Sequence, residues 1–137
     1  MFYYNQYIRA KSLEEAYELY QKRQNFIVGG MLWTKMKNTT LGTAIDLCEL
    51  GLDGIEENEN EFRIGAYVSL RDIETNESLN KYTDNAFADS VKDIVGVQFR
   101  NVATVGGSMA FKVEQFVYGR LQSLIFSIGI NKITFFK

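Results

Sequence analysis

The spacing of apolar side chains predicts that the chain opens with an amphipathic helix over residues 12–23. Ser12 and Glu15, three residues apart, match the pattern of a capping box, in which a serine hydroxyl and a glutamate carboxylate satisfy backbone N–H groups. Apolar residues then recur at helical spacing and would form one buried face. They are Leu13, Ala16, Tyr17 and Tyr20.

Strands and turns are predicted over the next forty residues. Residues 25–30 (NFIVGG) are typical of a short buried strand that ends at a glycine pair, and residues 31–38 of a helical turn. Residues 43–50 (TAIDLCEL) predict a second strand. Residues 55–68 predict a β-hairpin with its tip at residues 58–60, because apolar residues resume on both sides of a polar turn.

Two further helices are expected before a second glycine pair. Ser69 is a suitable cap for a helix over residues 69–79, and Asp84 for one over residues 84–95, which Gly96 would end. Helices and strands therefore mix without the regular βαβ period of about 30 residues, and we expect an α+β fold in two lobes. The lobes would be residues 1–55 and 56–137, with the second lobe incomplete and divergent from about residue 109.

The amino-acid composition excludes more kinds of catalytic and metal-binding site than the net charge does. The 137 residues include no histidine and a single cysteine, Cys48, which we interpret as a small core residue of the second strand. Imidazole catalysis, the usual serine and cysteine triads, zinc ribbons and cysteine-bound iron–sulfur clusters are therefore excluded within this chain. Chemistry would have to come from a cofactor, with no catalytic side chain and no metal site.

Charge and hydropathy suggest a soluble cytoplasmic protein. The formal net charge is −2 with both signs scattered along the chain, so nucleic acid is not an expected partner. The N-terminal residues lack the apolar run of a signal peptide. No segment approaches the roughly 20 apolar residues of a membrane-spanning helix.

Two glycine pairs, Gly29-Gly30 and Gly106-Gly107, each follow an apolar run. Without a side chain, glycine lets a ligand approach the main chain, and consecutive N–H groups at such a corner can bind phosphate oxygens. Thr104 and Ser108 add hydroxyl groups beside the second pair. A tight turn without a ligand is the alternative for either pair, and neither matches the dinucleotide G-x-G-x-x-G or P-loop patterns.

Three segments resemble a known family: residues 12–38, residues 44–74 and residues 87–108, the last ending in RNVATVGGS. They are similar to the flavin-binding subunit or domain of molybdenum hydroxylases, the xanthine dehydrogenase and carbon monoxide dehydrogenase group. The resemblance implies a two-lobed FAD-binding fold of the vanillyl-alcohol-oxidase (PCMH) type. It extends in register from Ser12 to Ser108.

The resemblance also implies a site, a cofactor and partners. Non-covalent FAD would be bound through its diphosphate, and electrons would reach it from a molybdopterin subunit through the iron–sulfur clusters of another subunit, then pass to NAD or another acceptor. The implied cofactor-binding residues are Ile27, Val28, Gly29, Gly30, Met31 and Leu32 in the first loop, and Ala103, Thr104, Gly106, Gly107 and Ser108 in the second.

The likeness fades after Ser108. Family members have an aspartate that binds the cofactor ten residues past the second glycine, where this chain has Val117, and they continue into a third domain. Two alternatives therefore stay open: a truncated, cofactor-free relative that acts as an interaction or assembly module, and a binder of nucleotide phosphates without redox function.

Overall fold

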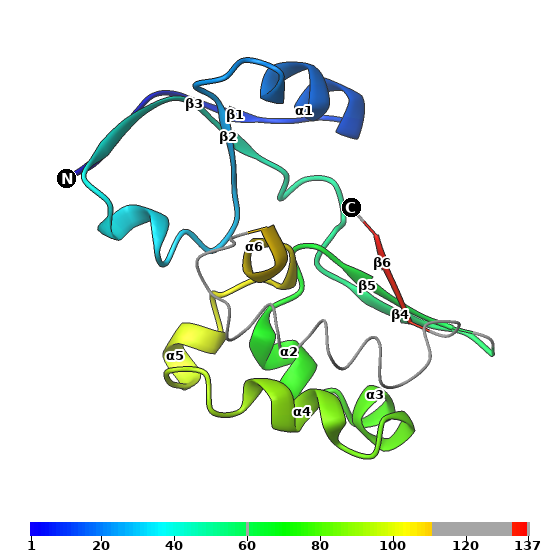
Figure 1. Cartoon of the computed structure of the whole chain (residues 1–137). Helices are drawn as coiled ribbons and strands as arrows, with labels where there is room; N and C mark the ends of the chain where they lie inside the picture. The colour runs from blue at the N-terminus through cyan, green and yellow to red at the C-terminus, as the bar shows by residue number, and fades with distance from the viewer. Residues whose placement is uncertain (60, 111–132, 137) are drawn as a thin grey trace.

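The computed structural model describes residues 1–59, 61–110 and 133–136, which form two small sheets with helices packed on them (Figure 1). The first sheet is parallel and has the order β1-β3-β2. Its strands are β1 (Phe2–Arg9), β2 (Phe26–Val28) and β3 (Thr39–Asp46). The sequence pattern did not predict β1, because residues 2–9 lack the two-residue alternation of a half-buried strand.

Helix α1 (Leu13–Tyr20) begins where the sequence predicted. The Ser12 hydroxyl accepts a hydrogen bond from the Glu15 amide (3.1 Å), while the Glu15 carboxylate accepts one from the Lys11 amide (2.7 Å). Ala16 is buried in a small cluster with Ala10 and Ile45 of the first sheet. The expected buried face is wrong in its other members, since Leu13, Tyr17 and Tyr20 are 44%, 67% and 52% exposed.

The short connections of the first sheet match the predictions in part. Residues 34–36 form the 3₁₀ turn η1 (Thr34–Met36) in the predicted helical segment. Strand β3 ends at Asp46, however, so Cys48 lies in the turn that follows it and is exposed. The assignment of Cys48 to the core was therefore wrong, because the strand begins and ends about four residues earlier than the hydrophobic run suggests.

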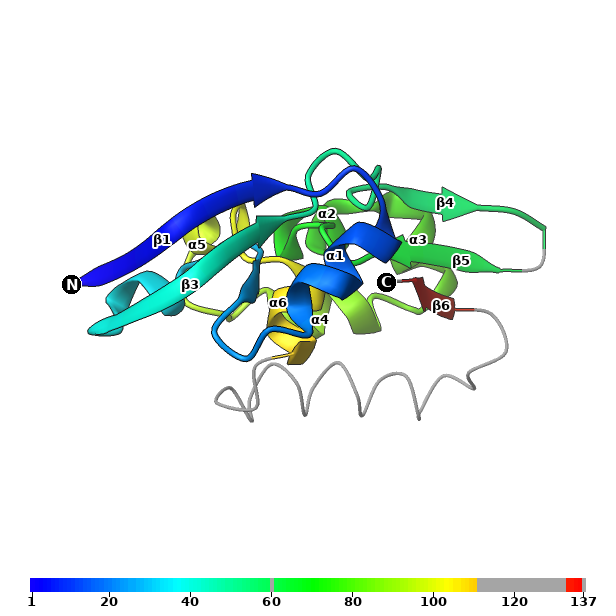
Figure 2. The same ribbon diagram turned by 90° about the horizontal axis from the view of Figure 1, so that it is seen from above.

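The second sheet contains the predicted hairpin. β4 (Ile55–Glu57) pairs antiparallel with β5 (Phe62–Gly65), and β6 (Ile133–Phe136) pairs parallel with β5. Figure 2 shows the two sheets side by side, with α1 over the first. The first sheet is formed by residues before 47 and the second by residues after 54. The division of the chain into two lobes at residue 55 stays a prediction.

Five short helices accompany the second sheet: α2 (Leu70–Thr75), α3 (Glu77–Tyr82), α4 (Ala86–Val91), α5 (Val97–Arg100) and α6 (Val105–Ala110). Ser69 and Asp72 form a complete capping box at the start of α2. The predicted helix over residues 69–79 is divided at Asn76, whose side chain accepts from the Leu79 amide and so begins α3. Asp84 is not the cap of α4, because that position is occupied by Asn85 in a left-handed conformation.

The larger of the two cores lies between these helices and β5. Leu70, Ile73, Phe87 and Val91 are fully buried there, at the spacing of one helix face. Val95 continues the helical spacing of Phe87 and Val91 but is 72% exposed, since α4 already ends at Val91. Within the described ranges, no helix is long and apolar enough to cross a bilayer, and no three acidic or cysteine side chains gather as a metal site.

Candidate functional site

The two glycine corners, residues 27–32 and 103–108, lie directly against each other. A Cβ placed on Gly29 would lie 2.9 Å from the Thr104 hydroxyl oxygen, and one on Gly30 would overlap the Val102 carbonyl oxygen. Contacts between heavy atoms at such distances are repulsive, so only glycine allows this approach. The fold thus brings together the two segments that the resemblance named, although about seventy residues separate them in the chain.

The first corner presents backbone N–H groups without acceptors. Its backbone reverses after β2, and Met31 adopts a left-handed conformation (φ 58°) that residues other than glycine rarely take. The Lys35 amide donates to the Met31 carbonyl (3.0 Å) and so fixes the start of η1. Among the described residues, the amides of Gly29, Gly30, Met31 and Leu32 have no hydrogen-bond acceptor.

The second corner is built differently from the loop that the sequence suggested. Gly106, Gly107 and Ser108 lie in the first turns of α6. The Gly107 amide donates to the Thr104 hydroxyl (3.1 Å) and the Ser108 amide to the Thr104 carbonyl (2.9 Å). These amides already have partners, so the second corner offers a ligand little backbone donor capacity.

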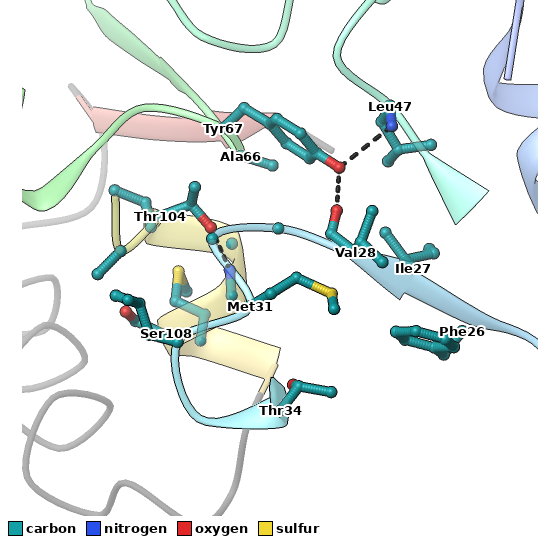
Figure 3. Close-up of a pocket in the computed structure, with 18 of the residues that line it drawn as sticks. Phe26, Ile27, Val28, Met31, Thr34, Leu47, Ala66, Tyr67, Thr104 and Ser108 are labelled. Atoms are coloured by element: carbon teal, nitrogen blue, oxygen red, sulfur yellow. Dashed lines mark hydrogen bonds between the residues drawn. The ribbon is translucent and has the colours of Figure 1, made fainter. Parts of the chain in front are cut away.

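One segment, residues 66–68, holds both corners in place. The Ala66 carbonyl accepts from the Gly106 amide (2.7 Å), and the Val68 carbonyl accepts from the Val105 amide (2.9 Å). On the other side, the Tyr67 hydroxyl donates to the Val28 carbonyl, at the end of β2. Figure 3 shows Tyr67 above this strand end, with Thr104 on the opposite side of the corner.

Tyr67 is a half-buried anchor that sequence reasoning missed. Its hydroxyl oxygen also accepts from the Leu47 amide (3.1 Å) and lies 3.4 Å from a carboxylate oxygen of Asp46. Burial raises the pKa of Tyr67 to about 12, and the Asp46 charge acts in the same direction, so the hydroxyl keeps its proton at neutral pH. No motif marks this tyrosine, because its role depends on the placement of β2 and β3.

Asp46 ends β3 beside this anchor. Its burial acts to raise its pKa, but hydrogen bonds from the Tyr7 hydroxyl and the Cys48 amide outweigh that effect and leave the pKa below its ordinary value. The ionised carboxylate thus helps to fix the turn that follows β3, next to the first corner.

An ion pair holds the approach to the second corner. Arg100, the last residue of α5, binds Glu74 of α2 through two nitrogens (2.8 and 3.2 Å) and donates to the Ile94 carbonyl (3.0 Å). Their side chains are only 7% and 14% exposed. The Arg100 guanidinium lowers the pKa of Glu74, and Arg71, 2.9 Å away, adds to this. Glu74 therefore lies in a nearly buried ion pair and not on a solvated helix face.

Both corners open onto one cavity of about 1050 Å³. This is slightly above the usual range for ligand pockets of about 300–1,000 Å³. Every residue of the two predicted loops lines it, as does the exposed face of α1. The remaining wall is largely apolar and aromatic: Phe26, Trp33, Leu47, Phe99 and Met109. Trp33, 44% exposed, contacts Phe99 edge to face (5.5 Å between ring centroids).

Two buried hydroxyl groups of this wall lack partners. Ser108 and Thr34 are 7% and 8% exposed, both line the cavity, and neither hydroxyl has a hydrogen bond among the described residues. Buried polar groups without partners are rare and destabilising. The cavity thus combines unpaired amides, unpaired hydroxyls and an apolar wall, a donor set that fits an elongated anionic ligand with planar rings.

Comparison with known proteins identifies the family. Residues 3–115 match the FAD-binding domain in molybdopterin dehydrogenase. The chain belongs to this family. None of the curated proteins matches it.

Solved structures agree with this assignment to the FAD-binding domain family. A Cu,Mo-containing CO dehydrogenase in its cyanide-inactivated form is 26% identical, with a TM-score of 0.68 over 78% of this chain and 40% of its own. The carbon monoxide dehydrogenase from Hydrogenophaga pseudoflava that lacks the Mo-pyranopterin moiety of the molybdenum cofactor is also 26% identical (TM-score 0.66; 77% and 39%).

Quinoline 2-oxidoreductase from Pseudomonas putida 86 shares the fold at 21% identity (TM-score 0.66; 80% and 39%). The chain spans about two fifths of the length of these matched chains. The mixed helix and strand fold of this FAD-binding domain is therefore confirmed.

Proposed function

We propose that this chain binds FAD non-covalently and is the flavoprotein part of a molybdenum-dependent oxidoreductase. The observation that carries the proposal is the contact, on one cavity, between two glycine corners that are far apart in the sequence. The four amides of residues 29–32 have no acceptor within the described ranges. Membership in the FAD-binding domain family supports the choice of FAD over other nucleotides.

The two corners would bind the cofactor in different ways. Residues 29–32 would donate backbone hydrogen bonds to the diphosphate oxygens, because their N–H groups have no acceptor in the described part of the chain. In the second corner, Ser108 would contribute its hydroxyl, while Thr104, Gly106 and Gly107 would shape the wall. The apolar and aromatic side chains would exclude water from the ring systems.

Bound FAD would supply the electron-transfer chemistry, and no side chain of this protein needs to act as acid or base on the organic substrate. We propose partner subunits that carry molybdopterin and iron–sulfur clusters, and membership in the molybdopterin dehydrogenase family supports the first of these. A xanthine dehydrogenase type of enzyme, with NAD or another molecule as electron acceptor and a cytoplasmic location, completes the proposal.

Titration of the purified full chain with FAD tests the central claim. Equilibrium dialysis should give saturable binding of one FAD per chain, and the bound flavin should show a perturbed visible absorption spectrum. Absence of saturable binding would reject the flavoprotein function.

A cofactor-free assembly module is the second candidate, favoured by the coverage of only about two fifths of the matched chains. It predicts binding to a molybdenum or iron–sulfur subunit with no flavin retained. Displacement experiments also test the other alternative, a binder of nucleotide phosphates without redox function. In that case ADP would displace a bound nucleotide, while riboflavin would have no effect.

A further inference from the structure

Thr34 is a buried residue whose hydroxyl group has no hydrogen-bond partner in the part of the chain that the structure describes. It begins η1, two residues after the first glycine corner, and is 8% exposed. Its carbonyl accepts from the Lys37 amide (3.1 Å), and the neighbouring turn is closed by the bond from Met36 to Trp33 (3.2 Å). The Thr34 carbonyl is therefore satisfied, while the side-chain oxygen has no partner among the described residues.

Two other buried hydroxyl groups show how such a group is satisfied within the protein. Thr83 donates to the Leu79 carbonyl (2.8 Å) and Ser90 to the Phe87 carbonyl (2.7 Å). A threonine in a helix or turn ordinarily satisfies itself by such local bonds. Thr34 does not, so its hydroxyl lowers stability unless a bound group supplies the partner.

The position of Thr34 indicates what that group is. Thr34 and Ser108 come from η1 and α6 and line the same cavity as the unpaired amides of the first corner (Figure 3). Thr43 also has a buried hydroxyl without a described partner, but it lies on β3 and does not line the cavity. The combination of burial, missing partner and cavity wall is thus met by Thr34 and Ser108, and only Ser108 lies in a predicted loop.

We propose that the Thr34 hydroxyl donates a hydrogen bond to an oxygen of the bound cofactor, in its diphosphate or in the adjoining ribose or ribityl chain. This inference rests on the proposed function and adds a binding residue outside both glycine corners. The hydrogen-bond acceptor would be an oxygen atom in the polar middle part of flavin adenine dinucleotide.

The matched substitutions Thr34→Val and Thr34→Ser test it in the full chain. Valine keeps the shape and removes the hydroxyl, so FAD should bind roughly five- to tenfold more weakly, the loss of one hydrogen bond to a ligand. Serine keeps the hydroxyl and should restore affinity to within about twofold. Thr43→Val is the control and should leave the affinity for FAD unchanged.

Stability without ligand gives an independent readout. Because the Thr34 hydroxyl has no partner in residues 1–59, 61–110 and 133–136, Thr34→Val should unfold in urea at the same or a higher midpoint than the wild type. A lower midpoint would overturn the inference, since it would show that the hydroxyl serves the fold. Unchanged affinity of Thr34→Val for FAD, ADP and FMN would overturn it as well.

Binding of ADP and FMN, which each contain part of FAD, shows which part of the cofactor accepts the hydrogen bond from Thr34. Weaker binding of ADP supports a contact to the diphosphate or ribose, and weaker binding of FMN alone supports one to the ribityl chain. If the proposed function is wrong, the wild-type chain will bind no FAD, and this result is known before any variant is measured.

Discussion

The two glycine corners have the same sequence signal and different physical roles. At residues 29–32 the amides have no acceptors among the described residues, and Met31 takes a left-handed conformation. At Gly106 and Gly107 the amides bind Ala66 and Thr104, and a Cβ on either glycine would lie 2.8 Å from an oxygen of the same residues. The first corner is suited to donate to a ligand, and the second to pack closely.

The difference shows why a glycine pair alone cannot be interpreted as a phosphate site. Glycine is required wherever atoms approach the main chain closely, whether they belong to a ligand or to the protein. Here all four glycines face protein atoms. The first corner can donate hydrogen bonds because of how its backbone turns. The second corner packs against it through Val102 and Thr104.

Removal of Glu74 should have the largest effect and should act through the second corner. Glu74→Leu leaves the Arg100 guanidinium buried without its partner, which typically costs about 3–5 kcal/mol. Urea unfolding should show this loss, together with weaker FAD binding. The control Asp89→Ala breaks the exposed pair with Lys92 and should cost less than about 1 kcal/mol. Equal losses in the two variants would contradict the role of burial.

Gly30→Ala should separate the two corners. The added methyl group would overlap the Val102 carbonyl oxygen, which belongs to the backbone and cannot rotate away. Overpacking of this kind costs about 1–3 kcal/mol, and FAD should no longer be retained. Gly54→Ala is the control, because no atom lies within 4 Å of its Cβ position. Normal flavin retention by Gly30→Ala would mean that the corners need not touch.

Tyr67→Phe should weaken the first corner more than the second. It leaves the Val28 carbonyl and the Leu47 amide without their partner, at a cost of about 1–3 kcal/mol. The affinity for FAD should fall with it. Tyr17→Phe is the matched control, since Tyr17 also lines the cavity but is 67% exposed, and its stability should stay within about 0.5 kcal/mol of the wild type. Identical behaviour of the two variants would refute the anchoring role.

Lowering the pH should reveal the smallest of the expected effects on stability. The ion pair lowers the pKa of Glu74 in the folded state, so its stabilising contribution is complete above the ordinary carboxylate pKa and is lost as pH falls through the lowered value. Urea midpoints measured downward from about pH 6 should therefore decline less steeply below about pH 4 in Glu74→Gln than in the wild type. Parallel declines would show that other carboxylates dominate the acid response.

Local signals in the sequence predicted much of the fold. Capping residues such as Ser12 and Ser69 marked the starts of α1 and α2, and the apolar run before Gly29 marked β2. Predictions that required knowledge of what surrounds a residue were less reliable. Cys48 and Val95 are exposed although their sequence context is apolar.

The sequence by itself determined the local elements and, through the resemblance, the family, because capping, periodicity and the RNVATVGGS motif depend on neighbouring residues. The tertiary structure alone decided how the corners function. The Tyr67 anchor, the unpaired Thr34 hydroxyl and the Arg100–Glu74 pair each depend on groups far apart in the chain. Hydrogen-bond partners and burial arise from such long-range packing, which a one-dimensional pattern does not contain.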